Sequence, residues 1–187
     1  MIKKIAFSLL ALFLAYQTIS IFVYAGTFPI KSSAVIVLVA AYLNLIVTGV
    51  FAFTGFVFPT QKLLPESYYS IKNSKSLKRT FKYLKVDFFR SFLLATVWRN
   101  KNKQKGYFNG NRDGFKSFVI QSKKSEFGHL IPFIILTLMS FCFLFDAKFI
   151  LGLFTIIINV IFNFYPILLQ RHHRMRIAIL EKRYGKK

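Results

Sequence analysis

Residues 130–169, LIPFIILTLMSFCFLFDAKFILGLFTIIINVIFNFYPILL, decide the fold of this chain. The stretch holds two apolar runs, about 130–145 and 149–169, which are separated only by Asp146, Ala147 and Lys148. A helix needs about 20 apolar residues to cross the roughly 30 Å of hydrocarbon in a bilayer. We therefore expect two membrane-spanning helices that are joined by a tight hairpin and run antiparallel.

Two further apolar runs, about 5–24 and 34–58, precede this hairpin. Of the 187 residues, 55% are hydrophobic and 24 are phenylalanine, which excludes an ordinary soluble domain. We predict an all-α integral membrane protein with four transmembrane helices in a single domain, residues 1–187. A signal peptide cleaved near Ala25 is the alternative for the first run, but this run exceeds the usual apolar length of about 7 to 15 residues.

Basic residues are concentrated in two parts of the chain. The segment 59–125 holds 16 Lys and Arg against three acidic residues, and the tail from Arg171 holds seven against Glu181. Each of the two short links between paired runs holds a single lysine. Since Lys and Arg collect on the cytoplasmic side of a membrane, we expect both termini, the insert 59–129 and the tail 170–187 to face the cytosol.

The insert contains one strongly amphipathic segment. Its apolar residues recur with the period of one helix face, while its basic residues lie largely elsewhere. The apolar set is Leu77, Phe81, Leu84, Phe88, Phe92 and Ala95. We expect a single helix that lies in the membrane surface against anionic lipid. Basic and aromatic residues also alternate in nucleic-acid-binding proteins, but no recognition fold is visible, so we expect no nucleic-acid partner.

Polar residues gather at one end of the last two runs. Glu126 and His129 are three residues apart and so share a helix face. A second polar stripe, at spacings of four, three, four and three, consists of Asn159, Asn163, Pro166, Gln170 and His173. An antiparallel hairpin places both groups at one depth. Taken singly, the amides could be interhelical hydrogen-bonding groups and the proline a kink, but together they indicate a site.

The residue types in this group suit acyl transfer to a hydroxyl. A histidine beside a carboxylate is a common general base for an alcohol, so we expect His129 to take the proton and Glu126 to orient it. Amides such as those of Asn163 and Gln170 can donate to a developing oxyanion, and the arginines that follow suit phosphate groups. These types predict an acyl donor that arrives from the cytosol.

Metal and disulfide chemistry are not expected. A di-iron site needs several carboxylates from neighbouring helices, and apart from Glu126 none of the acidic residues sits in a span. Cys142 is the only cysteine, which excludes an intramolecular disulfide. A small transporter is also disfavoured, because four spans without inverted repeats leave little material for alternating access.

About half of the chain, roughly 88–177, resembles the glycosyl-4,4'-diaponeurosporenoate acyltransferase family. The resemblance rests on KKSEFGH at 123–129 and on the pattern N-x-x-P-I-x-x-Q-R-x-x-R-x-R at 163–176, with a weaker match around 89–110. It implies a membrane enzyme that places a fatty acyl chain on the sugar of a lipid-linked carotenoid glycoside. It also implies acyl-coenzyme A or acyl carrier protein as co-substrate, and no bound cofactor.

With the polar stripe, the resemblance gives a predicted substrate-binding set. Its members are Asn159, Asn163, Gln170, Arg171, Arg174, Arg176, Trp98, Lys123 and Lys124. The chain departs from its relatives where they typically read QRYNRPR, because 170–176 reads QRHHRMR here, and Gln121 stands where an acidic residue is usual. The alternative function is a non-catalytic membrane subunit whose basic insert binds anionic lipid or an acidic partner. That alternative predicts that charge reversal in 78–85 matters more than loss of Glu126 and His129.

Overall fold

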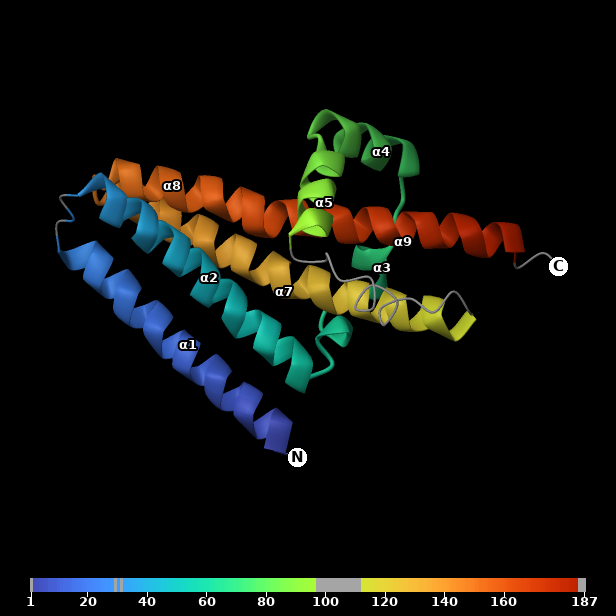
Figure 1. Ribbon diagram of the computed structural model, residues 1–187, viewed down its shortest axis with the longest axis horizontal. Helices are drawn as coiled ribbons and strands as arrows, with labels where there is room; N and C mark the ends of the chain where they lie inside the picture. The colour runs from blue at the N-terminus through green and yellow to red at the C-terminus, as the bar shows by residue number, and fades with distance from the viewer. Residues whose placement is uncertain (1, 29, 31, 97–111, 185–187) are drawn as a thin grey trace. The chain divides into compact units, whose positions relative to one another are not determined.

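The computed structural model describes residues 2–28, 30, 32–96 and 112–184, with side chains described as far as 96 and again over 117–179 (Figure 1). Within these ranges every regular element is helical. Four stretches are long and apolar enough to cross a membrane: Ile2–Thr27, Ser33–Val57, Ser117–Phe145 and Phe149–Ile179. The predicted all-α architecture with four such helices is confirmed for the described residues, while the sidedness of the chain stays a prediction.

The chain packs as two compact units, each built from two stretches of sequence. Unit 1 comprises 1–60 and 127–166, and unit 2 comprises 61–126 and 167–187. The single-domain organisation stays a prediction.

Unit 1 is a bundle of long apolar helices. It contains α1 (Ile2–Thr27), α2 (Ser33–Val57), the later part of α7 (Arg112–Phe145), α8 (Phe149–Asn159) and the π-helix η2 (Val160–Phe164). Helix α2 lies beside both α1 and α8 (Figure 1). The buried core joins Leu43 and Val47 of α2 to Leu136 and Phe143 of α7 and Leu151 of α8. The predicted hairpin is therefore the scaffold on which α2 packs.

The hairpin is fastened to the end of α1 by a lysine. Ala147 adopts a left-handed conformation (φ 58°) that lets the chain reverse between α7 and α8. The Nζ atom of the next residue, Lys148, donates to the carbonyl oxygens of Ala25 and Gly26. A helix leaves its last carbonyls unpaired and carries partial negative charge there, so an ammonium group stabilises that end. Retention of the first span after synthesis stays a prediction, and this contact favours it.

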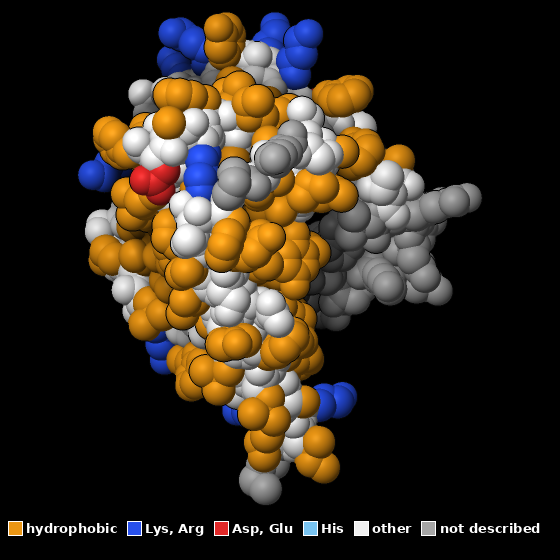
Figure 2. Space-filling view, turned by 90° about the vertical axis from the view of Figure 1, so that its left-hand side faces the viewer, with side chains coloured by type: hydrophobic (Ala, Val, Ile, Leu, Met, Phe, Trp, Pro, Cys, Tyr) orange, Lys and Arg blue, Asp and Glu red, His pale blue; other side chains and the backbone are white. Residues whose placement is uncertain are grey.

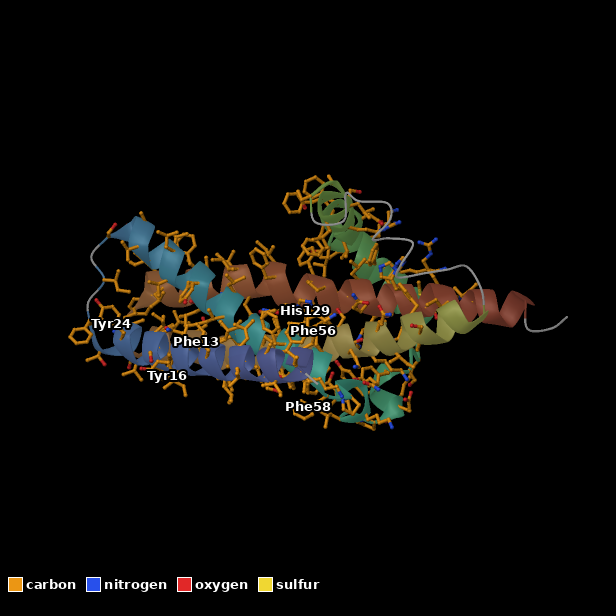
Figure 3. The ribbon with its side chains drawn as sticks, turned by 60° about the horizontal axis from the view of Figure 1, so that its bottom comes forward. Phe13, Tyr16, Tyr24, Phe56, Phe58 and His129 are labelled. Carbon is orange, nitrogen blue, oxygen red and sulfur yellow. The ribbon has the colours of Figure 1, made fainter. Side chains whose placement is uncertain are left out.

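Apolar side chains cover the outside of unit 1. In Figure 3, Phe13, Tyr16 and Tyr24 project from α1, and Phe56 and Phe58 lie at the far end of α2. All five side chains are exposed, and the face seen in Figure 2 is largely hydrophobic. In water such a surface would promote aggregation. In a bilayer it is the surface expected of helices whose own backbone satisfies every polar group.

Unit 2 contains short helices and the ends of two long ones. Its elements are η1 (Thr60–Lys62), which begins in unit 1, then α3 (Glu66–Tyr69), α4 (Ser74–Tyr83), α5 (Val86–Ala95), the first part of α7 and most of α9 (Tyr165–Tyr184). Asn73 caps α4 by accepting a hydrogen bond from the Ser76 amide at 2.9 Å.

The prediction of one continuous amphipathic helix over 77–95 is wrong. The chain ends α4 at Tyr83 and begins α5 at Val86. Lys85 between them has φ 49°, in the left-handed region, which breaks the helical period. Phe81 is buried against the ring of His172 at a centroid distance of 4.0 Å, whereas Phe88 is exposed. The burial of Phe81 and the exposure of Phe88 thus place the two halves in different environments, although their apolar residues recur with one period.

Candidate functional site

In unit 1, the imidazole of His129 is held by an amide. His129 projects from α7 (Figure 3), and its Nδ1 lies 3.1 Å from Oδ1 of Asn163. An amide oxygen only accepts hydrogen bonds, so this geometry requires the hydrogen on Nδ1. In the neutral ring the lone pair is then on Nε2, the nitrogen that could accept a proton from a substrate.

The orientation of Asn163 is itself determined by a chain of hydrogen bonds. Its Nδ2 donates to Oδ1 of Asn159 at 3.0 Å, and Nδ2 of Asn159 donates to the Phe133 carbonyl at 2.9 Å. Because a backbone carbonyl can only accept, it sets the direction of Asn159, and Asn159 sets that of Asn163. Thr48 adds a hydroxyl hydrogen bond to Asn163 Oδ1 at 3.1 Å. Both asparagines are fully buried, so the relay has no competition from water.

A local irregularity of the last long helix accompanies this relay. Residues Val160–Phe164 form a π-helix, in which the Tyr165 amide donates to the Val160 carbonyl. Pro166 has no amide hydrogen, so it cannot bond the Phe162 carbonyl as a regular α-helix would require. The turn before Pro166 thus departs from α-helical geometry in the segment that carries Asn163, the residue bonded to His129.

In unit 2, a buried carboxylate joins two arginines. Glu126 has no exposed surface; its Oε1 accepts from Nε of Arg171 at 2.8 Å and its Oε2 accepts from Nη2 of Arg174. Arg174 also donates from Nη1 to the Ser122 hydroxyl at 2.9 Å, and that hydroxyl donates to the Gln170 carbonyl at 3.2 Å. A buried carboxylate needs such partners, because unpaired charge in the interior is costly.

The two arginines differ in their access to solvent. The side chain of Arg171 is 34% exposed, whereas that of Arg174 is 6% exposed. A partly exposed guanidinium retains more donors for a ligand than a buried one does. Of the pair, Arg171 is the better candidate for contact with an incoming anion.

Two tyrosines that sequence reasoning missed lie against these cations. The ring of Tyr68 lies 4.9 Å from the guanidinium of Arg171, and the ring of Tyr69 lies 5.4 Å from that of Arg174. The Lys123 ammonium lies 5.3 Å from the Tyr69 ring and pairs with Glu66. Each cation is therefore in range of a cation–π interaction. Burial, followed by the charge of Glu126, raises the pKa of Tyr68 above its usual value and that of Tyr69 to about 12.

The predicted site residues thus fall into two groups. His129, Asn163 and Asn159 form one network in unit 1, while Glu126, Arg171, Arg174, Lys123 and the Gln170 backbone belong to unit 2. The sequence paired Glu126 with His129; in the structure the carboxylate bonds arginines and the imidazole bonds Asn163.

The remaining predicted substrate-binding residues are Arg176, Lys124 and Trp98. Arg176 is exposed and Lys124 is partly exposed. Trp98 lies outside the described residues.

Comparison with known proteins identifies a family. A family model described as "Glycosyl-4,4'-diaponeurosporenoate acyltransferase" (CrtO) matches residues 65–183, which is more than half of the chain. The matched region begins before Tyr68 and Tyr69 and includes both groups of candidate residues. No curated protein and no solved structure matches the chain.

Proposed function

Because this chain belongs to the glycosyl-4,4'-diaponeurosporenoate acyltransferase family and is an acyltransferase, we propose that it moves a fatty acyl chain from a thioester donor to a hydroxyl of a lipid-linked sugar. The donor is acyl-coenzyme A or an acyl carrier protein, and the acceptor is a carotenoid glycoside. The apolar exterior of unit 1 supports this choice, because a membrane-soluble acceptor reaches such an enzyme through the bilayer.

In the proposed reaction, Nε2 of His129 removes the proton from the sugar hydroxyl. The hydroxyl oxygen attacks the thioester carbonyl carbon and forms a tetrahedral oxyanion. When the carbon–sulfur bond breaks, the imidazolium returns the proton to the departing sulfur, which leaves an ester and a thiol. General acid–base catalysis of this kind contributes about 10² to 10⁴ in rate.

Asn163 acts as a positioning residue in this proposal. An imidazole that is free to turn would present either nitrogen to the hydroxyl. The relay from Phe133 through Asn159 to Asn163 keeps the hydrogen on Nδ1 and the lone pair on Nε2. The 3.1 Å bond between His129 and Asn163 is the observation that carries the assignment of the base.

In this proposal Glu126 does not orient the base His129, which was the role expected from the sequence. We propose that it holds Arg171 and Arg174, which bind the phosphates of the donor. Gln170 and Arg176 keep their predicted roles as a carbonyl-polarising amide and a phosphate-binding cation. These assignments rest on residue type and on the arginine–carboxylate contacts of unit 2.

Replacement of His129 by alanine tests the proposal. We expect product formation to fall by about 10² to 10⁴ while the protein remains in the membrane. The measurement is mass spectrometry of the acylated glycoside formed by membrane fractions that receive acyl-coenzyme A or acyl carrier protein.

His173→Asn is the control, because the ring of His173 packs edge-on against Phe118 and is not part of the relay that holds His129. This variant should retain activity. Turnover by His129→Ala at the level of the unsubstituted chain would eliminate His129 as the base.

A further inference from the structure

Unit 2 contains a cavity of about 550 Å³ that is lined in part by Arg174, one of the two arginines assigned to the donor phosphates. Its walls come from α3, the residues that follow it, α7 and α9. Tyr69, Lys123 and Arg174 supply polar groups, while Met175 and Ile177 supply part of an apolar wall. A cavity with few polar groups on an apolar lining is the usual form of a ligand site.

Two buried hydrogen-bonding groups at this cavity have no partner among the residues whose side chains are described. They are the hydroxyl of Tyr69 and Nε of Arg174. Tyr69 is 3% exposed and Arg174 is 6% exposed. Buried polar groups are nearly always satisfied in folded proteins, so two orphans on one cavity wall point to a ligand that pairs with them.

Both groups are suited to a ligand that carries acceptor oxygens. A guanidinium has only donors, so Arg174 can bond nothing else. Tyr69, whose pKa is about 12, keeps its proton at neutral pH and can donate it. The environment is also cationic, because the Lys123 ammonium lies 5.3 Å from the Tyr69 ring.

Lys123 can turn toward a ligand at little cost. Its present partner, Glu66, lies at 2.6 Å, but the side chain of Glu66 is 81% exposed. Exposed ion pairs contribute little to stability, so an anion in the cavity could displace Glu66. The charge of Arg174, by contrast, is held by Glu126 and Ser122, while its buried Nε has no partner among the residues whose side chains are described.

We propose that this cavity binds a phosphate ester, with the Tyr69 hydroxyl and Arg174 Nε as donors to its oxygens and Lys123 as a supporting charge. The proposal deepens the proposed function, and rests on it, where the phosphate is that of the thioester donor. Coenzyme A and the prosthetic group of a carrier protein both carry phosphate esters. A phospholipid headgroup has the same chemistry and is the other source.

The test measures binding to the full chain in dodecyl maltoside micelles, which contain no phosphate. Coenzyme A is titrated by calorimetry into the unsubstituted chain and into Tyr69→Phe, which loses the hydroxyl and keeps the ring beside both cations. We expect affinity to fall about 12- to 160-fold, the effect of one hydrogen bond to a charged group. Pantetheine, which lacks phosphate, should bind at least about 10-fold more weakly than coenzyme A.

Tyr83→Phe is the matched control, since Tyr83 is exposed on α4 and does not line the cavity. It should bind coenzyme A as the unsubstituted chain does. Gel filtration and thermal unfolding of each variant show whether Tyr69→Phe is folded.

A second arm adds phosphatidylglycerol to identify the source of the phosphate. If phosphatidylglycerol displaces coenzyme A from the unsubstituted chain, the cavity is assigned to a lipid headgroup. If no displacement occurs, the cavity is assigned to the donor. The phosphate site is overturned if neither probe binds, if folded Tyr69→Phe binds both unchanged, or if pantetheine binds as tightly as coenzyme A. His129→Ala should bind coenzyme A normally, so failure of the assigned base and failure of this site give different results.

Discussion

At the residue scale, the most constrained side chain outside the imidazole network is Glu126. Its carboxylate is fully buried, and each oxygen accepts a hydrogen bond from a different arginine. A buried ion pair adds little net stability when it is intact, but removal of one member leaves the other charge uncompensated. The free energy of unfolding lost when one member is removed therefore exceeds the free energy that the intact pair contributes.

Glu126→Gln should consequently destabilise the fold. The amide keeps the shape of the side chain but removes the charge that balances Arg174, so we expect a loss of about 3 to 5 kcal/mol. Thermal unfolding in detergent, followed by circular dichroism, measures it. Glu66→Gln is the control, because its exposed pair with Lys123 should contribute little. Equal, small shifts for both variants would contradict a stabilising role for Glu126.

Some of these residues could be recognised from the sequence and others could not. Glu126, His129 and the polar stripe stand out because polar residues are rare in apolar runs. Tyr68 and Tyr69 do not, since two aromatics in a short polar segment have no periodicity. Their meaning depends on Lys123 and Arg174, which lie more than 50 and 100 residues further along. The pairing of Glu126 with arginines was equally hidden, because spacing shows which residues share a face and not which cation lies opposite.

At the element scale, the α7–α8 hairpin depends on a close approach at Gly152. The Ser140 hydroxyl donates to the Gly152 carbonyl at 2.6 Å. A Cβ atom at position 152 would lie 2.9 Å from Leu144 and 3.0 Å from the Ser140 carbonyl oxygen. Small residues allow membrane helices to pack this closely. The tight connection could be predicted from the three residues that separate the two apolar runs. The glycine contact could not, because it depends on how each helix is rotated about its own axis.

Gly152→Ala should loosen the hairpin. The added methyl group overpacks the contact, and we expect a loss of about 1 to 3 kcal/mol in unfolding free energy. The same substitution at Gly26, where nothing lies within 4 Å of the added atom, is the control and should be neutral or stabilising. Thermal unfolding of the two variants in one detergent compares them. An unchanged transition for Gly152→Ala would show that the helices can separate without cost.

The break between α4 and α5 shows where periodicity misleads. Apolar spacing over 77–95 fits one helix, yet Lys85 adopts a left-handed conformation without the glycine or asparagine that would announce it. The stack of Phe81 on His172 gives the reason.

At the scale of the whole molecule, the distribution of charge predicts the sidedness of the four helices. The insert and the tail carry most of the Lys and Arg, and the two short links carry one lysine each. The helices themselves were predictable because their length and hydropathy are fixed by the thickness of a bilayer. The division into two compact units was not, because it arises from packing among segments that are distant in sequence.

Labelling of single cysteines tests the sidedness. In a Cys142→Ser background, a cysteine in place of Asp146 should react with a membrane-impermeant maleimide in intact cells. A cysteine in place of Lys78, which is exposed on α4, should react only after the cells are permeabilised. The reverse pattern would invert the proposed orientation and would place the arginines away from any cytosolic donor.

The contact of Lys148 with the end of α1 has a consequence for biosynthesis. The two partners are more than 120 residues apart, so the first helix leaves the ribosome long before its cap is translated. Until the final hairpin enters the translocon, the carbonyls of Ala25 and Gly26 depend on water or lipid headgroups. This contact therefore forms late, and a nascent chain arrested before residue 148 lacks the ammonium group that pairs with the end of its first helix.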